Sequence, residues 1–240
     1  MRKKIKQDNV TSYYQNTKIV DNYDCKRFSS PSGQYIDFIE KSAVKTFIGK
    51  PSYTNEIILD LASGTGRFTF LLTELGYKVI AVDYSLTMLK QIKQKSKKHN
   101  LNIICVRADI NYLPFKNKST LKANCTRFLW HYKNWKEMLK EIMRVTSGFV
   151  VFDVMNKKSL RYFITPIANR IVTHELVNET EVTNFCIENQ FKISDKKFLF
   201  LFPYIFHLKL FFLSNIFQYI EKHFGSLKKY ASIIFFKISH

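Results

Sequence analysis

The chain has 240 residues, of which 46% are hydrophobic and 24% charged, and these proportions suit one globular domain with a substantial core. It contains only 7 glycines and 5 prolines and no repeated segment, which excludes collagen-like, low-complexity and solenoid architectures. Thirty-eight Lys and Arg residues against nineteen Asp and Glu residues give a formal net charge of +19. This excess favours anionic partners such as phosphates, nucleic acid or acidic lipid headgroups. Solvated lysines are the plainer explanation, because the bases are scattered along the chain.

The amino terminus and the cysteines indicate a cell compartment. A short basic start, residues 2–6, has no apolar segment behind it, so no secretory signal is predicted and the cytoplasm is expected. The four cysteines are far apart and form no C-x-x-C or Cys/His cluster, so we predict neither a disulfide framework nor a metal site. Buried, inert thiols are the simpler interpretation.

Strands and helices are predicted to alternate along the first two thirds of the chain. Apolar residues at helical spacing over 35–47 predict a helix that Gly49 and Pro51 end. Short β-branched runs and amphipathic segments then follow in turn. We expect strands at 56–60, 78–82, 102–106, 122–129 and 148–154, and helices at 67–75, from Ser85 to about 99, and at 135–145.

This alternation predicts a parallel sheet that helices cover on both faces through right-handed connections. Beyond residue 156 we expect helices at 160–171 and 177–189 and strands at 191–202 and 232–239. The predicted fold is therefore a single α/β domain, 1–240, with a doubly wound, seven-stranded, mostly parallel sheet. Its parts would be an amino-terminal cap (1–50), a ligand-binding core (55–155) and carboxyl-terminal strands (156–240) with an apolar helical insertion at about 203–228.

A glycine turn follows the first predicted strand of the core. Gly64 and Gly66 stand where a turn enters a helix, which brings backbone N–H groups close to an acceptor-rich ligand. A dinucleotide site would need a third glycine at position 69 and no acid before the turn. Thr69 and Asp60 therefore disfavour a nicotinamide-dependent dehydrogenase.

Three carboxylates lie at the ends of three successive predicted strands. Asp60 can supply the field that a cationic ligand needs, directly or through water. Asp83 can accept hydrogen bonds from a ribose diol, and Asp109 can accept one from the exocyclic amino group of adenine. Together they describe an adenosine ligand with a cationic tail.

The chain resembles the class I S-adenosylmethionine-dependent methyltransferases, in particular their small-molecule group, over about residues 55–155. The matching segments are 59–67 (LDLASGTGR), 82–85 (VDYS) with Met88, and 108–110 (ADI) before 113–115 (LPF). The resemblance implies a Rossmann-like methyltransferase fold, S-adenosyl-L-methionine as cofactor and no metal. Its implied cofactor residues are Asp60, Ala62, Ser63, Gly64, Gly66, Asp83, Tyr84, Met88, Asp109, Ile110 and Thr126.

Two segments depart from the family pattern. The fourth strand lacks its usual acidic start, because the chain has 119–125 (STLKANC) there. The usual proline-glycine-glycine turn before the fifth strand is reduced to 146–148 (TSG). Both departures affect the edges of the fourth strand more than the cofactor pocket.

The segment after the fourth strand would face the acceptor. His131 is a candidate general base, or a loop histidine with a structural hydrogen bond. Arg127 can pair with the carboxylate of the cofactor or a phosphate of the acceptor, or lie outward in solvent. Tyr13 and Tyr23 would close the pocket from the amino-terminal side, or pack against the sheet.

The segment 198–220 is dense in Phe, Leu and Ile, and its length suggests a membrane span. Pro203, His207 and Lys209 interrupt it, and a span would break the sheet on either side. We prefer a strand followed by apolar helices folded over the acceptor pocket. Peripheral contact with a membrane, aided by nearby lysines, is the alternative.

These features predict a methyltransferase acting on a small-molecule or lipid-like acceptor at O, N or C. The net charge of +19 suggests an alternative, which is a methyltransferase or a noncatalytic relative that acts on RNA or another polyanion. The sequence shows neither an appended RNA-binding module nor an Asn-Pro-Pro-Tyr tetrapeptide after the fourth strand, either of which would support that alternative. Nucleic acid is therefore not favoured as a partner.

Overall fold

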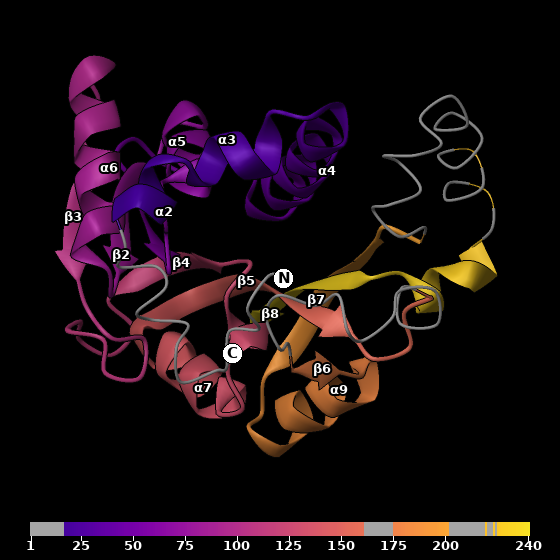
Figure 1. Ribbon diagram of the computed structural model, residues 1–240. Coiled ribbons are helices and arrows are strands. Elements are labelled where there is room, and N and C mark those ends of the chain that lie inside the picture. Colours follow the sequence, from indigo (N-terminus) through magenta and orange to yellow (C-terminus); the bar gives the residue numbers. More distant parts are fainter. Residues whose placement is uncertain (1–16, 161–174, 202–218, 220–222, 224) are drawn as a thin grey trace.

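A mostly parallel sheet with helices on both faces forms the centre of the fold (Figure 1). The computed structural model describes residues 17–160, 175–201, 219, 223 and 225–240. Seven strands follow one another in the order β3-β2-β1-β4-β5-β8-β7, and β6 pairs with β5 beside this path. The strands are β1 (Ile57–Leu61), β2 (Lys78–Asp83), β3 (Ile104–Arg107), β4 (Thr120–Cys125), β5 (Thr146–Asn156), β6 (Leu176–Val177), β7 (Lys192–Leu199) and β8 (Ile233–Ser239).

Helices precede the sheet and connect its strands. The α-helices are α2 (Thr17–Asp21), α3 (Tyr23–Phe28), α4 (Pro31–Ile48), α5 (Arg67–Glu74), α6 (Leu86–Lys98), α7 (Trp135–Val145) and α9 (Glu179–Glu188), and the 3-10 helices are η2 (Leu129–His131) and η5 (Gly225–Tyr230). Ser85 caps α6 by accepting a hydrogen bond from the backbone N–H of Met88, and Ser30 caps α4 in the same way through Gly33.

The order of the strands fixes where a ligand can lie. The chain runs outward from β1 through β2 to β3 and then returns to place β4 on the other side of β1. All of these pairings are parallel, so the carboxyl ends of the four strands share one edge of the sheet. The reversal between β1 and β4 is the switch point at which open α/β sheets bind ligands.

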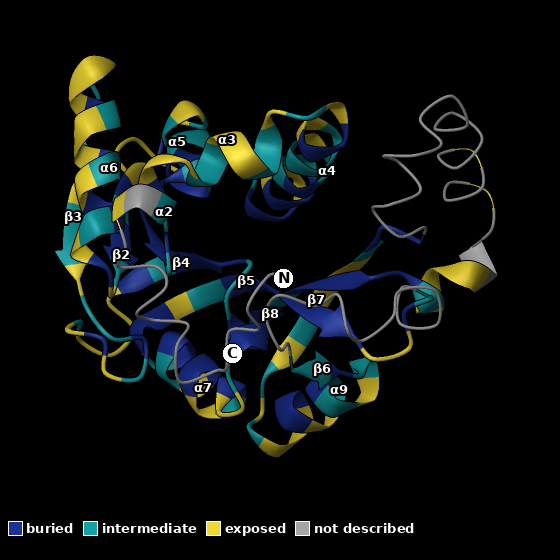
Figure 2. Ribbon diagram, viewed as in Figure 1, coloured by how far each residue is buried: buried dark blue, intermediate teal, exposed yellow. Residues whose placement is uncertain are grey.

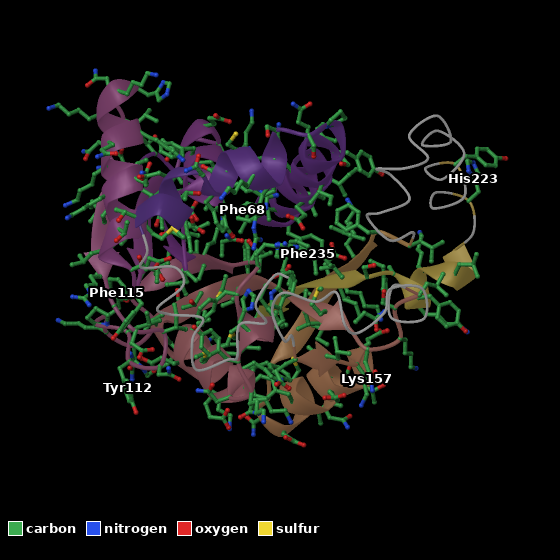
Figure 3. The ribbon with its side chains drawn as sticks, viewed as in Figure 1. Phe68, Tyr112, Phe115, Lys157, His223 and Phe235 are labelled. Atoms are coloured by element: carbon green, nitrogen blue, oxygen red, sulfur yellow. The ribbon has the colours of Figure 1, made fainter. Side chains whose placement is uncertain are left out.

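Two large apolar clusters and a smaller one under α6 join the helices to the two faces of the sheet (Figure 2). On one face α4 and α5 contribute Val44 and Leu72, and Phe68 lies in the same cluster as Phe235 of β8 (Figure 3). On the other face α7 and α9 pack Leu139 and Phe185 against the strands. Each of these four helices thus buries an apolar stripe, as its sequence pattern requires.

The predicted α/β fold with a mostly parallel, doubly wound sheet is confirmed. Seven strands form the continuous path, and the antiparallel β8 lies between β5 and β7. The helix predicted at 135–145 is α7, with the same bounds. The short β6 was not predicted.

Several boundaries were wrong, among them the end of the strand predicted at 191–202, which is β7 and ends at Leu199. The strand predicted at 122–129 ends at Cys125, because the chain turns into η2. The helix predicted at 177–189 begins at Glu179, because Asn178 caps it and Val177 belongs to β6. Residues 146–148, expected as a turn, already belong to β5. The helix expected at 160–171 and most of the insertion expected at 203–228 lie outside the described residues.

Candidate functional site

A cavity of about 460 Å³ lies at the carboxyl ends of β2, β3 and β4. This volume is within the range of small-molecule sites, about 300–1,000 Å³. Its lining combines two carboxylates on one side with aromatic and basic side chains on the other. The lining residues are Tyr23, Ala62, Asp83, Tyr84, Ser85, Met88, Asp109, Ile110, Asn111, Arg127, Phe128, His131, Tyr132 and Met138.

The glycine turn after β1 uses left-handed backbone at three alternate positions. Ala62, Gly64 and Gly66 have φ values of 52°, 56° and 91°. At Gly66 a Cβ atom would lie 2.8 Å from the ring of Phe70 and 3.0 Å from Ile92. Glycine there lets α5 and α6 approach each other closely. At Gly64 a Cβ atom would meet no atom within 4 Å, so the backbone at this point of the turn faces open space.

Asp83 ends β2 and joins the glycine turn to the start of α6. Its Oδ2 accepts a hydrogen bond from Gly64 N–H at 2.8 Å, and its Oδ1 accepts one from Ser85 N–H at 2.8 Å. Burial raises the pKa of Asp83, while these backbone N–H groups oppose the rise. The two contacts hold the carboxylate in one orientation at the wall of the cavity, where each oxygen retains acceptor capacity.

Asp60 lies behind this wall, and the structure does not place it in the cavity lining. It is 1% exposed, and its oxygens accept hydrogen bonds from Thr69 Oγ1 at 2.5 Å and Asn124 Nδ2 at 2.8 Å. Burial raises the pKa of Asp60 to about 6. The hydroxyl of Thr69 thus has a structural function at the position where a dinucleotide site would need glycine.

The end of the cavity near β3 combines a carboxylate, that of Asp109, with apolar side chains. Asp109 Oδ1 accepts hydrogen bonds from the backbone N–H and the side-chain amide of Asn111, both at 2.8 Å. Met88 and Ile110 line the same cavity and are 3% and 4% exposed. A flat heterocycle with a donor at its edge fits such a surface, because apolar side chains cover its face and the carboxylate meets its edge.

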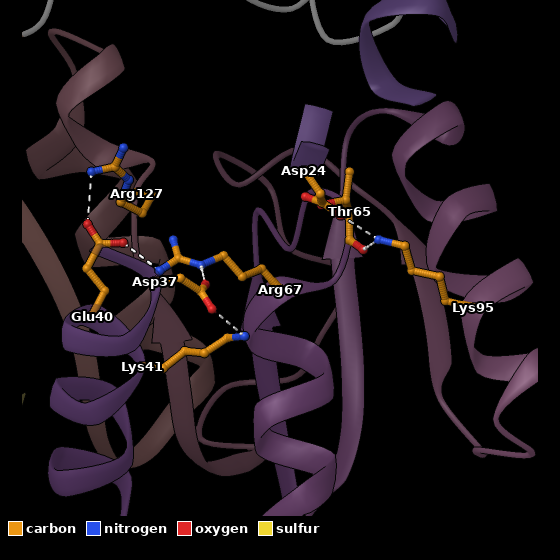
Figure 4. Close-up of polar contacts among 8 residues, drawn as sticks. All are labelled: Asp24, Asp37, Glu40, Lys41, Thr65, Arg67, Lys95 and Arg127. Carbon is orange, nitrogen blue, oxygen red and sulfur yellow. Dashed lines mark hydrogen bonds and ion pairs between the residues drawn. The ribbon is translucent and has the colours of Figure 1, made fainter. Parts of the chain in front are cut away.

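A buried network of charges joins α4 to the opposite end of the cavity (Figure 4). Glu40 is fully buried, and its two oxygens face two guanidinium groups. Arg127 Nη1 lies 3.0 Å from Oε1, and Arg67 Nη2 lies 2.7 Å from Oε2. Arg67 also pairs with Asp37. These contacts fix the side chain of Arg127 at the cavity wall, so the outward, solvated alternative does not describe it.

A second polar cluster attaches α3 to the glycine turn (Figure 4). Asp24 accepts a hydrogen bond from Thr65 Oγ1 at 2.7 Å and pairs with Lys95 of α6 at 2.6 Å. Lys95 also donates to the carbonyl oxygen of Thr65 at 3.1 Å. Together with Glu40, this cluster holds the amino-terminal helices against the turn.

His131 lines the cavity from η2 and is 8% exposed. The indole N–H of Trp130 donates to His131 Nε2 at 3.1 Å. Because an indole nitrogen only donates, Nε2 is the acceptor and a neutral imidazole carries its proton on Nδ1. A proton taken up at Nε2 would therefore compete with the hydrogen bond from Trp130.

The structure brings many of the predicted residues to one cavity. Those that line it are Ala62, Asp83, Tyr84, Met88, Asp109, Ile110, Tyr23, Arg127 and His131. The lining does not include Asp60, Ser63, Gly64, Gly66 or Thr126, although Gly64 holds Asp83 in place. Tyr13 lies outside the described residues.

Sequence reasoning missed Ser85, Asn111, Tyr132 and Met138 as lining residues. The helix-cap position of Ser85 and the apolar stripe of α7 at Met138 were the available signals. No group of three or more His, Cys, Asp or Glu residues within the described part of the chain could hold a metal ion.

A family model described as "Methyltransferase domain" matches residues 58–147, which carry the glycine turn, Asp83, Asp109 and Arg127. This match supports the expected resemblance to the class I S-adenosylmethionine-dependent methyltransferases over that segment. The chain is 30% identical to a malonyl-[acyl-carrier protein] O-methyltransferase of a Marinomonas species over 143 residues, 56% of this chain and 52% of the relative. The chain spans about half the length of the curated relatives it matches.

Solved structures of low sequence identity share the fold. Magnesium protoporphyrin IX methyltransferase from Synechocystis PCC 6803, crystallised with bound S-adenosylmethionine, superposes with a TM-score of 0.66 at 13% identity. That comparison covers 97% of this chain and 95% of the other. The [4+2]-cyclase SpnF superposes with a TM-score of 0.69 at 12% identity, covering 99% and 97% of the two chains. A cyclase and a methyltransferase thus share this fold, so the fold alone does not fix the reaction.

No helix in the described ranges has the length and hydropathy needed to cross a membrane. Most of the apolar segment 198–220 lies beyond those ranges, so its predicted role as a lid or membrane contact stays a prediction.

Proposed function

We propose that this protein transfers a methyl group from S-adenosyl-L-methionine to a small-molecule or lipid-like acceptor. The observation that carries the proposal is the Asp83 carboxylate, which two backbone N–H groups orient at the wall of a cavity beside a glycine turn. The family match and the similarity to a malonyl-[acyl-carrier protein] O-methyltransferase support the general kind of reaction.

The residues of the cavity suit an adenosine cofactor. Asp83 can accept hydrogen bonds from the two ribose hydroxyls, and Asp109 can accept one from the amino group of adenine. Met88 and Ile110 would cover the faces of the base. The open space at Gly64 lets a ligand approach the backbone of the turn without a side chain in between.

When bound, S-adenosylmethionine supplies an electrophilic methyl group on a sulfonium centre. The chain then has to align the acceptor with that group, and orientation of this kind contributes about 7–11 kcal/mol to catalysis. Tyr23, Phe128 and Tyr132 provide an aromatic wall that can orient an apolar acceptor and exclude water. His131 would hydrogen-bond to the acceptor through Nδ1. Its use as a base at Nε2 requires the contact with Trp130 to be given up.

A polyanionic acceptor such as RNA is the second candidate, because the formal net charge is +19. Several exposed lysines of α6, among them Lys90, Lys93, Lys97 and Lys98, lie on the outer surface of the sheet's helical cover. The cavity itself favours a small acceptor, because its lining is mostly aromatic and apolar around a few polar groups.

Incubation with cofactor labelled in the methyl group and with cell extract tests the proposal. The reaction is separated into lipid, small-molecule, RNA and protein fractions, and label is expected in the lipid or small-molecule fraction. Asp83→Ala should abolish most of this label. Asp195→Ala, which removes an exposed carboxylate from β7, is the matched control and should not. Label confined to RNA would favour the second candidate, and absence of label from every fraction would contradict methyl transfer.

A further inference from the structure

The backbone of Arg127 has an unusual conformation at the wall of the cavity. Its φ of 67° lies in the left-handed region, which non-glycine residues rarely adopt. The buried Asp153 stabilises it, because Oδ1 accepts the Arg127 N–H at 2.6 Å. A strained backbone that a buried carboxyl group maintains is a common feature of binding sites. The contact with Asp153 thus fixes the backbone that carries the Arg127 side chain at the cavity wall.

The guanidinium of Arg127 retains donors for a ligand. Its Nη1 pairs with Glu40, and the group lies 4.7 Å from the ring centre of Trp130. An arginine has five N–H donors in a planar fork. Among the residues that the structure describes, Glu40 is the one acceptor with a side-chain hydrogen bond to Arg127. The side chain is 29% exposed and lines the cavity, so its other donors are accessible from there.

The carboxylate of Glu40 is shared between two guanidinium groups. Arg67 has Asp37 as a second partner, whereas Glu40 is the one carboxylate that forms a side-chain ion pair with Arg127 among the described residues. Burial raises the pKa of Asp153 to about 7, so this neighbouring group adds only part of a negative charge near neutral pH. A partly buried guanidinium whose charge is only partly neutralised is unfavourable until an anion pairs with it.

The order of the strands places Arg127 away from the proposed nucleoside site. Asp109 follows β3, Asp83 ends β2, and Arg127 follows β4 on the far side of β1. In the proposed function, the two carboxylates are assigned to adenosine and would repel an anion at their end of the cavity. An anionic group is thus directed to the end that holds Arg127, where the acceptor has to lie.

We propose that the methyl acceptor carries an anionic group, a carboxylate or a phosphate, which Arg127 binds, with Glu40 as the positioning residue. The proposal rests on the proposed function. Arginine suits both anions, because its planar fork can donate two parallel hydrogen bonds. The carboxylate of the cofactor's own amino-acid tail has the same chemistry, and the experiment separates these two sources.

Calorimetric titration of pyrophosphate and of malonate into the protein saturated with S-adenosylhomocysteine tests the proposal. We expect saturable binding of at least one of these anions to the wild type. Arg127→Gln should weaken it by at least about tenfold, and Arg127→Lys should weaken it less. Lys90→Gln removes the same charge from the exposed face of α6 and should leave binding unchanged. Equal anion affinity in the wild type and Arg127→Gln would overturn the proposal.

Repeating the titration with 5′-methylthioadenosine, a nucleoside without the amino-acid tail, identifies the source of the anion. Comparable anion binding to both nucleoside complexes supports an anionic acceptor. Binding only to the complex that lacks the tail would assign Arg127 to the cofactor carboxylate and overturn the proposal. A wild type that binds neither nucleoside would instead contradict the proposed function itself.

The positioning role of Glu40 has its own measurement. Glu40→Asp keeps the charge but moves the carboxylate away from Arg127, so it should weaken anion binding while the affinity for 5′-methylthioadenosine stays unchanged, because Glu40 contacts Arg127 and not the nucleoside end of the cavity. Equal weakening of both ligands would indicate a general structural role and contradict positioning. If this variant does not fold, the Arg127 variants still decide the main proposal, because that side chain is partly exposed.

Discussion

Replacing Asp83 by alanine tests the assignment of the ribose hydroxyls. The carboxylate oxygens are already oriented by Gly64 and Ser85, so little further ordering is needed when a diol binds. A hydrogen bond to a charged group contributes about 1.5–3 kcal/mol. Water entering the space left by the side chain would satisfy part of what is lost, so we expect a net loss near the value for one such bond. Asp83→Ala should therefore weaken S-adenosylhomocysteine binding by about 10- to 150-fold.

Isothermal titration calorimetry measures this loss directly, with Asp195→Ala as the control for removal of a carboxylate. The same titration with an S-adenosylhomocysteine that lacks the ribose 2′-hydroxyl completes a double-mutant cycle. If Asp83 binds that hydroxyl, the analogue and unmodified S-adenosylhomocysteine should bind the Asp83→Ala variant with nearly equal affinity. An unchanged affinity for Asp83→Ala, or fully additive losses in the cycle, would refute the reasoning.

Three other predictions follow from buried groups. Burial raises the pKa of Asp153 to about 7, above the value of about 4 in the unfolded chain. The folded state then binds more protons than the unfolded state, and the free energy of unfolding should fall as pH rises from about 4 to 7. Asp153→Asn should flatten this dependence in urea titrations, and an unchanged slope would exclude Asp153 as its source. Thr69→Val removes a donor to buried Asp60 and should lower the free energy of unfolding by about 1–3 kcal/mol, with an unaltered urea midpoint as the contrary result. His131→Ala should slow methylation without weakening cofactor binding, and normal turnover would remove His131 from the acceptor site.

The sequence predicts those parts of the fold that local patterns determine. The helix at 135–145 has a continuous apolar stripe and is found with the expected bounds. The strands before Gly64 and Asp83 are short apolar runs with clear ends, and both are present within one residue. The fourth strand was predicted to be too long, because Phe128 and Leu129 are apolar although the chain leaves the sheet after Cys125. Apolar side chains in this segment indicate that it is buried. A buried loop packed against α7 has such side chains just as a strand does.

Contacts between distant segments could not be predicted in this way. Glu40, Arg67 and Arg127 are separated by 27 and 60 positions in the sequence (67 − 40 and 127 − 67), and no local pattern relates them. Their meeting depends on where α4 packs on the sheet. The orientation of Asp83 was similarly hidden, since it depends on a backbone N–H of a turn that precedes it by 19 residues. Residue types at strand ends thus predicted Asp83 and Asp109 at the cavity but misplaced Asp60 there, and tertiary packing determined how these groups are held.

A crystal structure of the protein with S-adenosylhomocysteine tests the central claim most directly. We expect adenosine to occupy the cavity at the ends of β2, β3 and β4, with its ribose hydroxyls within hydrogen-bonding distance of Asp83 and its base between Met88 and Ile110. A ligand bound elsewhere on the chain, or a ribose directed away from Asp83, would contradict that claim.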